Sequence, residues 1–412
     1  MQRAARGEIF MKRGVKVKPV ELKKGIYWVG AVDWNIRDFH GYSTYEGTTY
    51  NSYLMVDDKI TLFDAVKKEH FSTLMAHISQ IVDPAKIDYL VVNHVEPDHS
   101  GSLPMLMEII KPETLFCSEM GYKALIGHFH NNDWPYKVVK SGDEVMLGKR
   151  KVIFQETRML HWPDSMFAYL PEEKLLISND AFGEHLATVE RFDDEVDQHR
   201  LMHQCAKYYA NIIWPYSGLV QKLIKTLGEL KWEIDMIAPD HGVIWRKDPA
   251  KIIAAYDKWS GYQASNRVVV AYESMWKSTE QMALQITQGL ADSNIDVQQM
   301  RLEITHRSEV VTALLEAKGL AVGSPTLNNN YMPQMADFLT YIKGLKPGNK
   351  LGLAFGSYGW SGEAVKQINE MLKATNFDLL NDGLRQQWVP DKDALKACYN
   401  LGTEMAQAIK QR

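Results

Sequence analysis

The stretch that decides the fold of the first half is Val91-Val92-Asn93-His94-Val95-Glu96-Pro97-Asp98-His99-Ser100-Gly101. It follows the apolar, β-branched run 87–92, which predicts a buried strand. Four metal-competent side chains therefore lie on the loop where that strand ends. In a regular strand the first three would share one face and His99 would oppose them. Pro97 interrupts that regularity, so we expect all four to converge on one point.

Three more candidate ligands each follow a predicted strand. His161 lies in Met-Leu-His-Trp-Pro-Asp-Ser, Asp180 ends the run 175–179, and His241 follows the run 237–240. Residues placed in this way are typical of ligands at successive strand ends of one layered sheet. The alternative for the first cluster is a polar loop whose histidines and acids cap a helix and meet solvent. The three additional residues favour a metal site.

The seven residues follow the pattern His-x-Glu-x-Asp-His, distant His, distant Asp, final His, which resembles the metallo-β-lactamase-like half of the flavodiiron proteins. Zinc hydrolases of this fold usually have His-x-His-x-Asp-His, and here Glu96 replaces the second His. A carboxylate makes the site harder and favours iron. The resemblance implies an αββα sandwich over residues 17–262. It also implies that one iron is bound by His94, Glu96 and His161, the other by Asp98, His99 and His241, and that Asp180 bridges them.

Two residues outside the motif are candidates for a catalytic role beside the metals. His40 lies in an aromatic and polar loop and is either a proton donor near the irons or a surface histidine. Tyr208 and Tyr209 are adjacent, and each is a candidate to point at the metals, although helix packing is the favoured role for either one. Of the pair, Tyr209 is taken as the candidate.

The other histidines lack partners at ligand spacing. His128 and His130 form a pair in Gly-His-Phe-His, but no carboxylate accompanies them, so surface or capping roles are expected. The remaining histidines without such partners are His70, His77, His185, His199, His203 and His306.

From residue 263 onward, strands alternate regularly with helices. This order predicts a parallel, doubly wound sheet whose ligand crevice lies at the carboxyl ends of the strands. Three loops at those ends resemble the FMN-binding loops of flavodoxins, and no Gly-x-Gly-x-x-Gly follows a strand, so FMN fits better than NAD. Lys277 stands where many flavodoxins have glycine. The alternative is an α/β domain that has lost its nucleotide. The candidate FMN-binding residues are Ser274, Met275, Trp276, Lys277, Ser278, Thr279, Ser324, Pro325, Thr326, Leu327, Asn328, Asn329, Ser357, Tyr358, Gly359, Trp360 and Gly362.

The bulk properties of the chain limit its domains and partners. A chain of 412 residues suggests two or three domains. The net charge of −4 argues against nucleic acid, and no apolar run is long enough for a membrane span. The three cysteines are widely separated, which predicts a reducing cytoplasm and no internal rubredoxin-like module. Residues 1–16 are expected to form a poorly ordered extension, and residues 263–412 the FMN-binding domain.

The resemblance implies a flavodiiron reductase of the two-domain class. FMN would pass electrons from a separate rubredoxin-like donor to a diiron site that reduces O2 to water, NO to N2O, or both. It also implies a head-to-tail homodimer, with tetramers possible by pairing of dimers. Two alternatives remain open: a zinc hydrolase with a flavodoxin-like regulatory domain, and a non-catalytic FMN electron carrier. Metal analysis distinguishes them.

Overall fold

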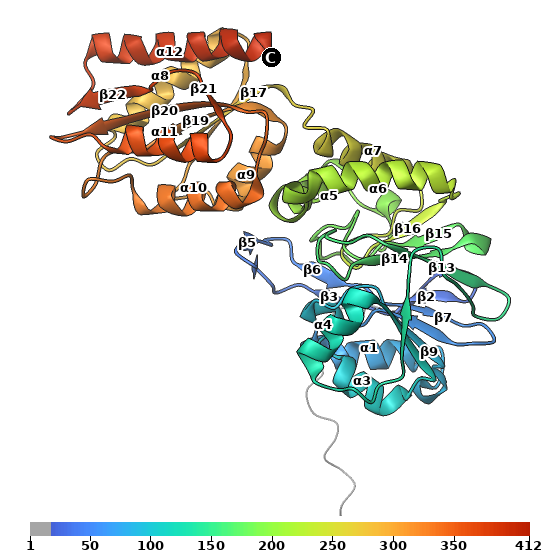
Figure 1. Ribbon diagram of the computed structural model, residues 1–412. Coiled ribbons are helices and arrows are strands. Elements are labelled where there is room, and N and C mark those ends of the chain that lie inside the picture. Colours follow the sequence, from blue (N-terminus) through green and yellow to red (C-terminus); the bar gives the residue numbers. More distant parts are fainter. Residues whose placement is uncertain (1–17) are drawn as a thin grey trace, which may run out of the picture.

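The computed structural model describes residues 18–412, which form two domains (Figure 1). The prediction of a poorly ordered extension over residues 1–16 lies outside the described part. The N-terminal domain runs from blue to yellow-green in Figure 1, and the C-terminal domain from gold to red. No helix within residues 18–412 is long and apolar enough to cross a bilayer.

Two sheets face each other in the N-terminal domain. The first has the order β1-β2-β7-β8-β9-β10-β11, and the second has the order β12-β13-β14-β15-β16. The strands of the first sheet are β1 (Val20–Lys23), β2 (Ile26–Trp28), β7 (Tyr53–Met55), β8 (Thr61–Phe63), β9 (Tyr89–Val92), β10 (Thr114–Ser118) and β11 (Tyr136–Val139). Those of the second are β12 (Glu144–Met146), β13 (Lys151–Glu156), β14 (Met166–Leu170), β15 (Leu175–Ile177) and β16 (Met236–Ala238). Two short pairs lie beside them: β3 (Ala31–Asp33) with β6 (Thr48–Tyr50), and β4 (Asp38–Phe39) with β5 (Tyr42–Ser43).

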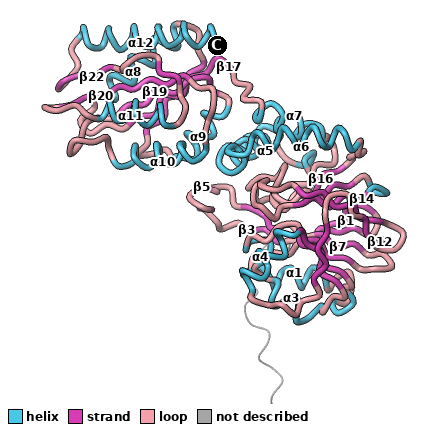
Figure 2. The backbone as a smooth tube through the Cα atoms, in the orientation of Figure 1, coloured by secondary structure: helices cyan, strands magenta, loops and turns pink. Residues whose placement is uncertain are grey.

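Helices cover the outer face of each sheet (Figure 2). On strand β9, Val91 packs between the sheets, whereas Leu90 and Val92 pack against the helices of the first sheet. Burial on both faces explains why this strand is apolar without alternation. The helices are α1 (Phe71–Ile78), α3 (Leu103–Ile110) and α4 (Glu119–Phe129) over the first sheet, and α5 (Gln198–Tyr208), α6 (Ser217–Leu230) and α7 (Pro249–Ser260) over the second. The predicted αββα sandwich is confirmed.

Two local predictions in this domain need correction. The sequence of residues 25–32 and of residues 49–56 predicts one strand in each range, but the structure has two short strands in place of each. The chains cross closely at Gly30, where a Cβ atom would lie 2.2 Å from the carbonyl oxygen of Tyr50. This crossing diverts both chains out of the large sheet into the β3–β6 pair. The sequence Ser102-Leu103-Pro104 predicts a helix capped by Ser102; Ser102 does precede α3, but its hydroxyl accepts from the N–H of Val66 and does not cap the helix.

The C-terminal domain has a parallel sheet in the order β18-β17-β19-β20-β21, with β22 also beside β20. Its strands are β17 (Ser265–Tyr272), β18 (Asp296–Arg301), β19 (Ala317–Gly323), β20 (Leu351–Tyr358), β21 (Asp378–Leu379) and β22 (Leu384–Gln387). Helices α8 (Ser278–Asp292) and α12 (Lys392–Gln411) pack on one face, and α9 (Arg307–Leu315), α10 (Pro333–Leu345) and α11 (Ala364–Ala374) on the other. The predicted doubly wound sheet is confirmed.

Two features of this domain differ from the prediction. The sequence predicts a helix over residues 309–317, but α9 ends at Leu315, because Ala317 already pairs with β17. Strand β22 was missed because Leu-Arg-Gln-Gln is polar and half exposed. The predicted domain boundary at 262/263 falls between α7 and β17 and stays a prediction.

One apolar cluster spans both domains. It begins on the outer face of the second sheet with residues of α5, α6 and α7, and it continues into α9, α10 and the adjacent face of the C-terminal sheet. Trp214 belongs to this cluster from the N-terminal side and Leu339 from the C-terminal side. The two domains therefore share part of their core.

A buried lysine at this junction makes stability depend on pH. Lys350 donates to the carbonyl oxygens of Leu315 and Ala317, and its ammonium lies 5.5 Å from the ring centre of Trp214. Burial lowers the pKa of Lys350 to about 7. Between pH 7 and the ordinary pKa of lysine the unfolded chain binds more protons, so stability should rise with pH in that window.

We expect Lys350→Met to abolish this contribution. The difference in free energy of unfolding between wild type and K350M should change by about 1.4 kcal/mol per pH unit between pH 7 and 9. Urea denaturation at pH 7, 8 and 9 measures it. A difference that is constant with pH would show that Lys350 stays charged in the folded protein.

Candidate metal centre

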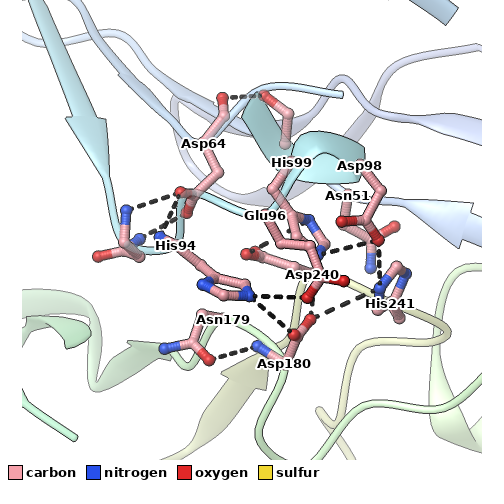
Figure 3. Close-up of polar contacts among 12 residues, drawn as sticks. Asn51, Asp64, His94, Glu96, Asp98, His99, Asn179, Asp180, Asp240 and His241 are labelled. Carbon is pink, nitrogen blue, oxygen red and sulfur yellow. Dashed lines mark hydrogen bonds and ion pairs between the residues drawn. The ribbon is translucent and has the colours of Figure 1, made fainter. Parts of the chain in front are cut away.

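The seven predicted ligands come together at one edge of the sandwich. His94 follows β9, and the short helix α2 (Pro97–Ser100) turns Asp98 and His99 back toward it. Asp180 and His241 follow the neighbouring parallel strands β15 and β16, and His161 follows β13. Figure 3 shows imidazoles and carboxylates from these loops pointing toward a common centre. The predicted convergence arises because the strands of both sheets end at this edge.

One group consists of His94, Glu96, His161 and Asp180, whose donor atoms lie within 4.8 Å of one another. The Nε2 atom of His161 is 3.1 Å from a Glu96 oxygen and 2.9 Å from Oδ2 of Asp180. Nε2 of His94 is 3.3 Å and 3.4 Å from the same two carboxylates. Neighbouring ligands of one ion at about 2.1 Å in octahedral positions lie about 3 Å apart. This spacing suits a single cation.

The second group consists of Asp98, His99 and His241. The Nε2 atoms of His99 and His241 lie 3.4 Å and 3.1 Å from Oδ2 of Asp98. They lie 3.1 Å and 3.5 Å from Oδ1 of Asp180. Asp180 therefore directs Oδ2 to the first group and Oδ1 to the second, which is the arrangement of a bridging carboxylate.

Orphaned polar atoms indicate that these groups are built for cations. Both carboxylate oxygens of Asp98, both ring nitrogens of His99 and Oδ1 of Asp180 are buried and form no hydrogen bond of proper geometry among the described residues, although the ion-pair contacts above join several of them. Burial alone would lower the pKa of His99, yet the carboxylates of Asp98 and Asp180 raise it to about 10. The acidic cluster thus demands positive charge, which protons or metal ions supply. The residues fit two cations.

Outer partners orient several ligands. Nδ1 of His94 lies 3.0 Å from a carboxylate oxygen of Asp164, which also accepts from the N–H of Val95. Nδ1 of His241 lies 2.6 Å from the carbonyl oxygen of Thr49. These contacts present Nε2 of each ring to the centre, because the other nitrogen donates outward.

We expect Asp164→Asn to weaken binding at the first group. The amide loses the charge that fixes the His94 ring, so metal affinity there should fall by about 10- to 100-fold. Competition against a chelator of known affinity measures the change. Equal loss at both positions would instead indicate general unfolding of the loop.

Two residues with left-handed backbones shape the loops behind the ligands. Asp64 has φ +52° and accepts from the N–H and side-chain amide of Asn93. Asn179 has φ +44° and its amide donates to the carbonyl oxygen of Met166. Both residue types tolerate this conformation, and the resulting turns place His94 and Asp180.

The candidate residues beside the ligands are only partly as predicted. His40 does reach the centre, with Nε2 2.7 Å from Oε1 of Glu96. Tyr209 lies away from the ligands, in the packing role given as its alternative: its hydroxyl bonds to Ser217 and its ring packs on Tyr256 in the core. Tyr208 occupies the place expected for it, with its ring centre 6.1 Å from that of His241.

His185 belongs to neither ligand group but lies beside them. It has no neighbour at ligand spacing, yet its ring centre is buried 4.7 Å from that of His241, and Nδ1 bonds to the hydroxyl of Thr48. Only tertiary packing places it there. Among the other discounted histidines, His128 bonds locally to Ala124, and His306 accepts from the N–H of Ser308 at the start of α9.

A second site lies at the carboxyl edge of the C-terminal sheet. A cavity of about 580 Å³ opens there, which is ordinary for a small cofactor. It is lined by residues of the three predicted loops: Met275, Trp276, Ser278, Pro325, Thr326, Asn328, Asn329, Ser357, Tyr358, Gly359 and Trp360. Helix α8 begins at Ser278, so its free N–H groups can bind a phosphate.

The other predicted residues support this cavity without lining it. Thr279 is buried and its hydroxyl bonds to Ser357. Lys277 has φ +69°, the conformation that a glycine favours, and its side chain is exposed. Ser274, Ser324, Leu327 and Gly362 also lie outside the lining. The prediction missed Ser361, Trp388 and Val389; the last two follow the unpredicted strand β22.

Known proteins resemble the chain over nearly its whole length. Residues 48–242 match the family model described as ODP family beta lactamase, and residues 270–402 match Flavodoxin. A nitric oxide reductase of Moorella thermoacetica is 48% identical, with 95% of this chain and 99% of that protein covered.

Two solved structures also match. The rubredoxin oxygen:oxidoreductase of Desulfovibrio gigas aligns with a TM-score of 0.94 at 44% identity, covering 96% of this chain and 99% of the other. The flavodiiron protein of Giardia intestinalis aligns with a TM-score of 0.93 at 34% identity, covering 97% and 98%. The chain therefore belongs to the flavodiiron proteins, a family of oxidoreductases, and its cofactors are FMN and a non-haem diiron centre.

Proposed function

We propose that the protein reduces O2, NO or both at a diiron centre held by the seven motif residues. The observation that carries this proposal is the shared carboxylate, with one oxygen of Asp180 directed to each donor group. The first iron is assigned to His94, Glu96 and His161, and the second to Asp98, His99 and His241. When bound, FMN supplies electrons and the two irons supply the positions at which a diatomic gas is reduced.

The surrounding residues have separate tasks in this proposal. The exposed His40 side chain contacts Glu96 from the solvent side of the site, where it can carry a proton from solvent to the centre. Burial, and then the Asp180 carboxylate, raise the pKa of Tyr208 far above its ordinary value, so its hydroxyl stays a neutral hydrogen-bond donor. Phe39, whose ring centre is 6.1 Å from that of His241, adds an apolar side chain beside the second group.

Electrons are proposed to come from a separate rubredoxin-like protein. The three cysteines, Cys117, Cys205 and Cys398, are free and buried, so none forms a Cys-x-x-Cys electron-transfer site, and they suit a reducing cytoplasm. At the FMN cavity Trp276 is 89% and Trp360 85% exposed. Large exposed aromatic side chains at a cofactor edge suit contact with a partner. A head-to-tail homodimer, in which the flavin of one subunit faces the irons of the other, would explain this exposure, and pairing of two such dimers would give a tetramer.

The test begins with metal and flavin analysis of the purified protein. We expect two irons and one FMN per chain. Anaerobic stopped-flow mixing of the reduced protein with O2 and with NO, separately, should then show flavin reoxidation much faster than that of free FMN. The gas that reacts faster is the preferred substrate.

Other results would replace the proposal. Zinc in both positions, with ester hydrolysis, would support a hydrolase. Bound FMN without metal would support an electron carrier. Glu96 favours iron over zinc, and the buried orphan atoms at the metal groups argue against a carrier.

A further inference from the structure

A small hairpin covers the metal centre. Strands β4 and β5 are joined by His40 and Gly41, which have φ +55° and +77°. Two consecutive positive φ angles are the mark of a type I′ turn, the tightest hairpin connection. Each strand has two residues, and an isolated two-stranded hairpin is marginally stable in water. Its position must therefore depend on contacts made from outside.

The hairpin carries two groups of the site. Nε2 of His40 is 2.7 Å from Oε1 of Glu96, and the Phe39 ring centre is 4.9 Å from that of His185. Both contacts come from the tip of the hairpin, so a shift of the tip would move both. The position of His40 relative to Glu96 therefore depends on the position of the hairpin.

Several of these outside contacts come from the C-terminal domain of the same chain. Figure 1 shows the β5 hairpin extending from the N-terminal domain toward α9. Nη2 of Arg307 donates to the carbonyl oxygen of Gly41 at 2.9 Å, and the Ser308 hydroxyl accepts from the N–H of Ser43. The Arg307 guanidinium is itself held by both carboxylate oxygens of Asp337, each at 2.8 Å. The Arg307 guanidinium therefore binds the hairpin at the tip of its turn.

Helix α9 is anchored in turn to the N-terminal domain. The Asn211 amide donates to the carbonyl oxygen of Ser308, and Asn211 accepts from the Tyr341 hydroxyl. Lys207 is buried, donates to the Ser43 hydroxyl, and forms an ion pair with Glu309. These contacts fix α9 against the end of α5, so Arg307 holds the hairpin from a rigid support.

We propose that each C-terminal domain positions the hairpin over the metal centre of its own chain, with Arg307 as the positioning residue for His40. The inference rests on the proposed ligand set, because it concerns how His40 is held against Glu96. In the proposed dimer a C-terminal domain then has two roles. It delivers electrons to the partner's irons, and it holds the β4–β5 hairpin over the metal centre of its own chain. Gly41 is suited to this contact, since a Cβ atom there would lie 2.5 Å from Nη2 of Arg307.

Hydrogen exchange of the full-length, iron- and FMN-loaded protein tests the proposal. In R307M, exchange of the peptide covering residues 38–45 should accelerate about tenfold or more, because a charge-assisted hydrogen bond that closes the hairpin is lost. R307K, which retains a cationic donor, should recover part of the protection. R267M is the matched control: it removes an Arg–Asp pair of the same domain that has no printed contact with the hairpin, and exchange over 38–45 should not change.

A second measurement separates positioning from general stability. The Mössbauer spectrum of the diferric protein should change for the iron assigned to Glu96 in R307M and stay as wild type in R267M. D337N, which loosens the Arg307 side chain without removing it, should give an intermediate result and guards against misfolding of R307M. Unchanged exchange over residues 38–45 in a loaded R307M protein would overturn the inference. Absence of two irons from the wild type would instead overturn the proposed function, whatever the exchange shows.

Discussion

Replacing Asp180 with asparagine should remove the coupling between the two metals and abolish turnover. An amide offers one acceptor oxygen and one N–H2 group, so it cannot direct a charged oxygen to each donor group as Asp180 does. Loss of a partner outside the ligand shell costs 10- to 100-fold, so loss of the bridge should lower gas-dependent flavin reoxidation by about a hundredfold or more.

Iron analysis and stopped-flow mixing check this result together. D180N should retain FMN and fewer than two irons per chain. Asp133→Asn, an exposed carboxylate of the same domain, is the control and should behave as wild type. Full activity in D180N would refute the assignment of the bridge.

Replacing Ser278 with aspartate should empty the flavin site while keeping the fold. Ser278 lines the FMN cavity and begins α8, where a carboxylate favours the helix through the dipole. The same carboxylate repels a phosphate bound at that helix end. A pair of like charges a few ångströms apart at a protein surface should weaken FMN affinity by about 100-fold or more. Ser278→Asn introduces a polar side chain of similar size without the charge, so its FMN affinity should fall much less than that of S278D. FMN fluorescence titration of the apoprotein measures both.

The two variants together test the dimer. D180N lacks working irons and S278D lacks flavin, so each alone should be inactive. In a head-to-tail dimer, a mixed pair places the flavin of D180N against the irons of S278D. Random exchange of equal amounts should then restore about a quarter of wild-type activity, since half the dimers are mixed and each has one working pair. No recovery despite subunit exchange would mean that each flavin serves the irons of its own chain.

Site residues that lie close together in the sequence, or directly after a predicted strand, could be predicted, whereas residues brought to the site by long-range packing could not. His94, Glu96, Asp98 and His99 stand within six residues, and the distant ligands each follow a strand end, so their convergence was predictable. Tyr208 was not distinguished from Tyr209. Helix α5 passes at that point into a π-helical turn over Tyr209–Ile213, which changes which face of the chain meets the core.

Long-range packing hid other features. His185 reaches the centre only because the loop after β15 folds against Thr48, and the sequence around His185 contains no motif that predicts this. The His40-Gly41 turn lacks the usual Asn-Gly signal, so the hairpin over the site was not predicted. In the C-terminal domain the polar sequence of β22 concealed a strand, and with it Trp388 at the edge of the flavin cavity.

The apolar cluster shared by the two domains limits how this protein can be divided. Severing the chain at residue 262 would leave Leu339 and its neighbours on one fragment, and Trp214 on the other, facing water. Separately expressed halves should therefore adhere to each other, or aggregate when kept apart. Use of the C-terminal domain alone as an electron-transfer protein would first require polar substitutions on the face that packs against the N-terminal domain. The protein therefore contains two folds that depend on each other for stability.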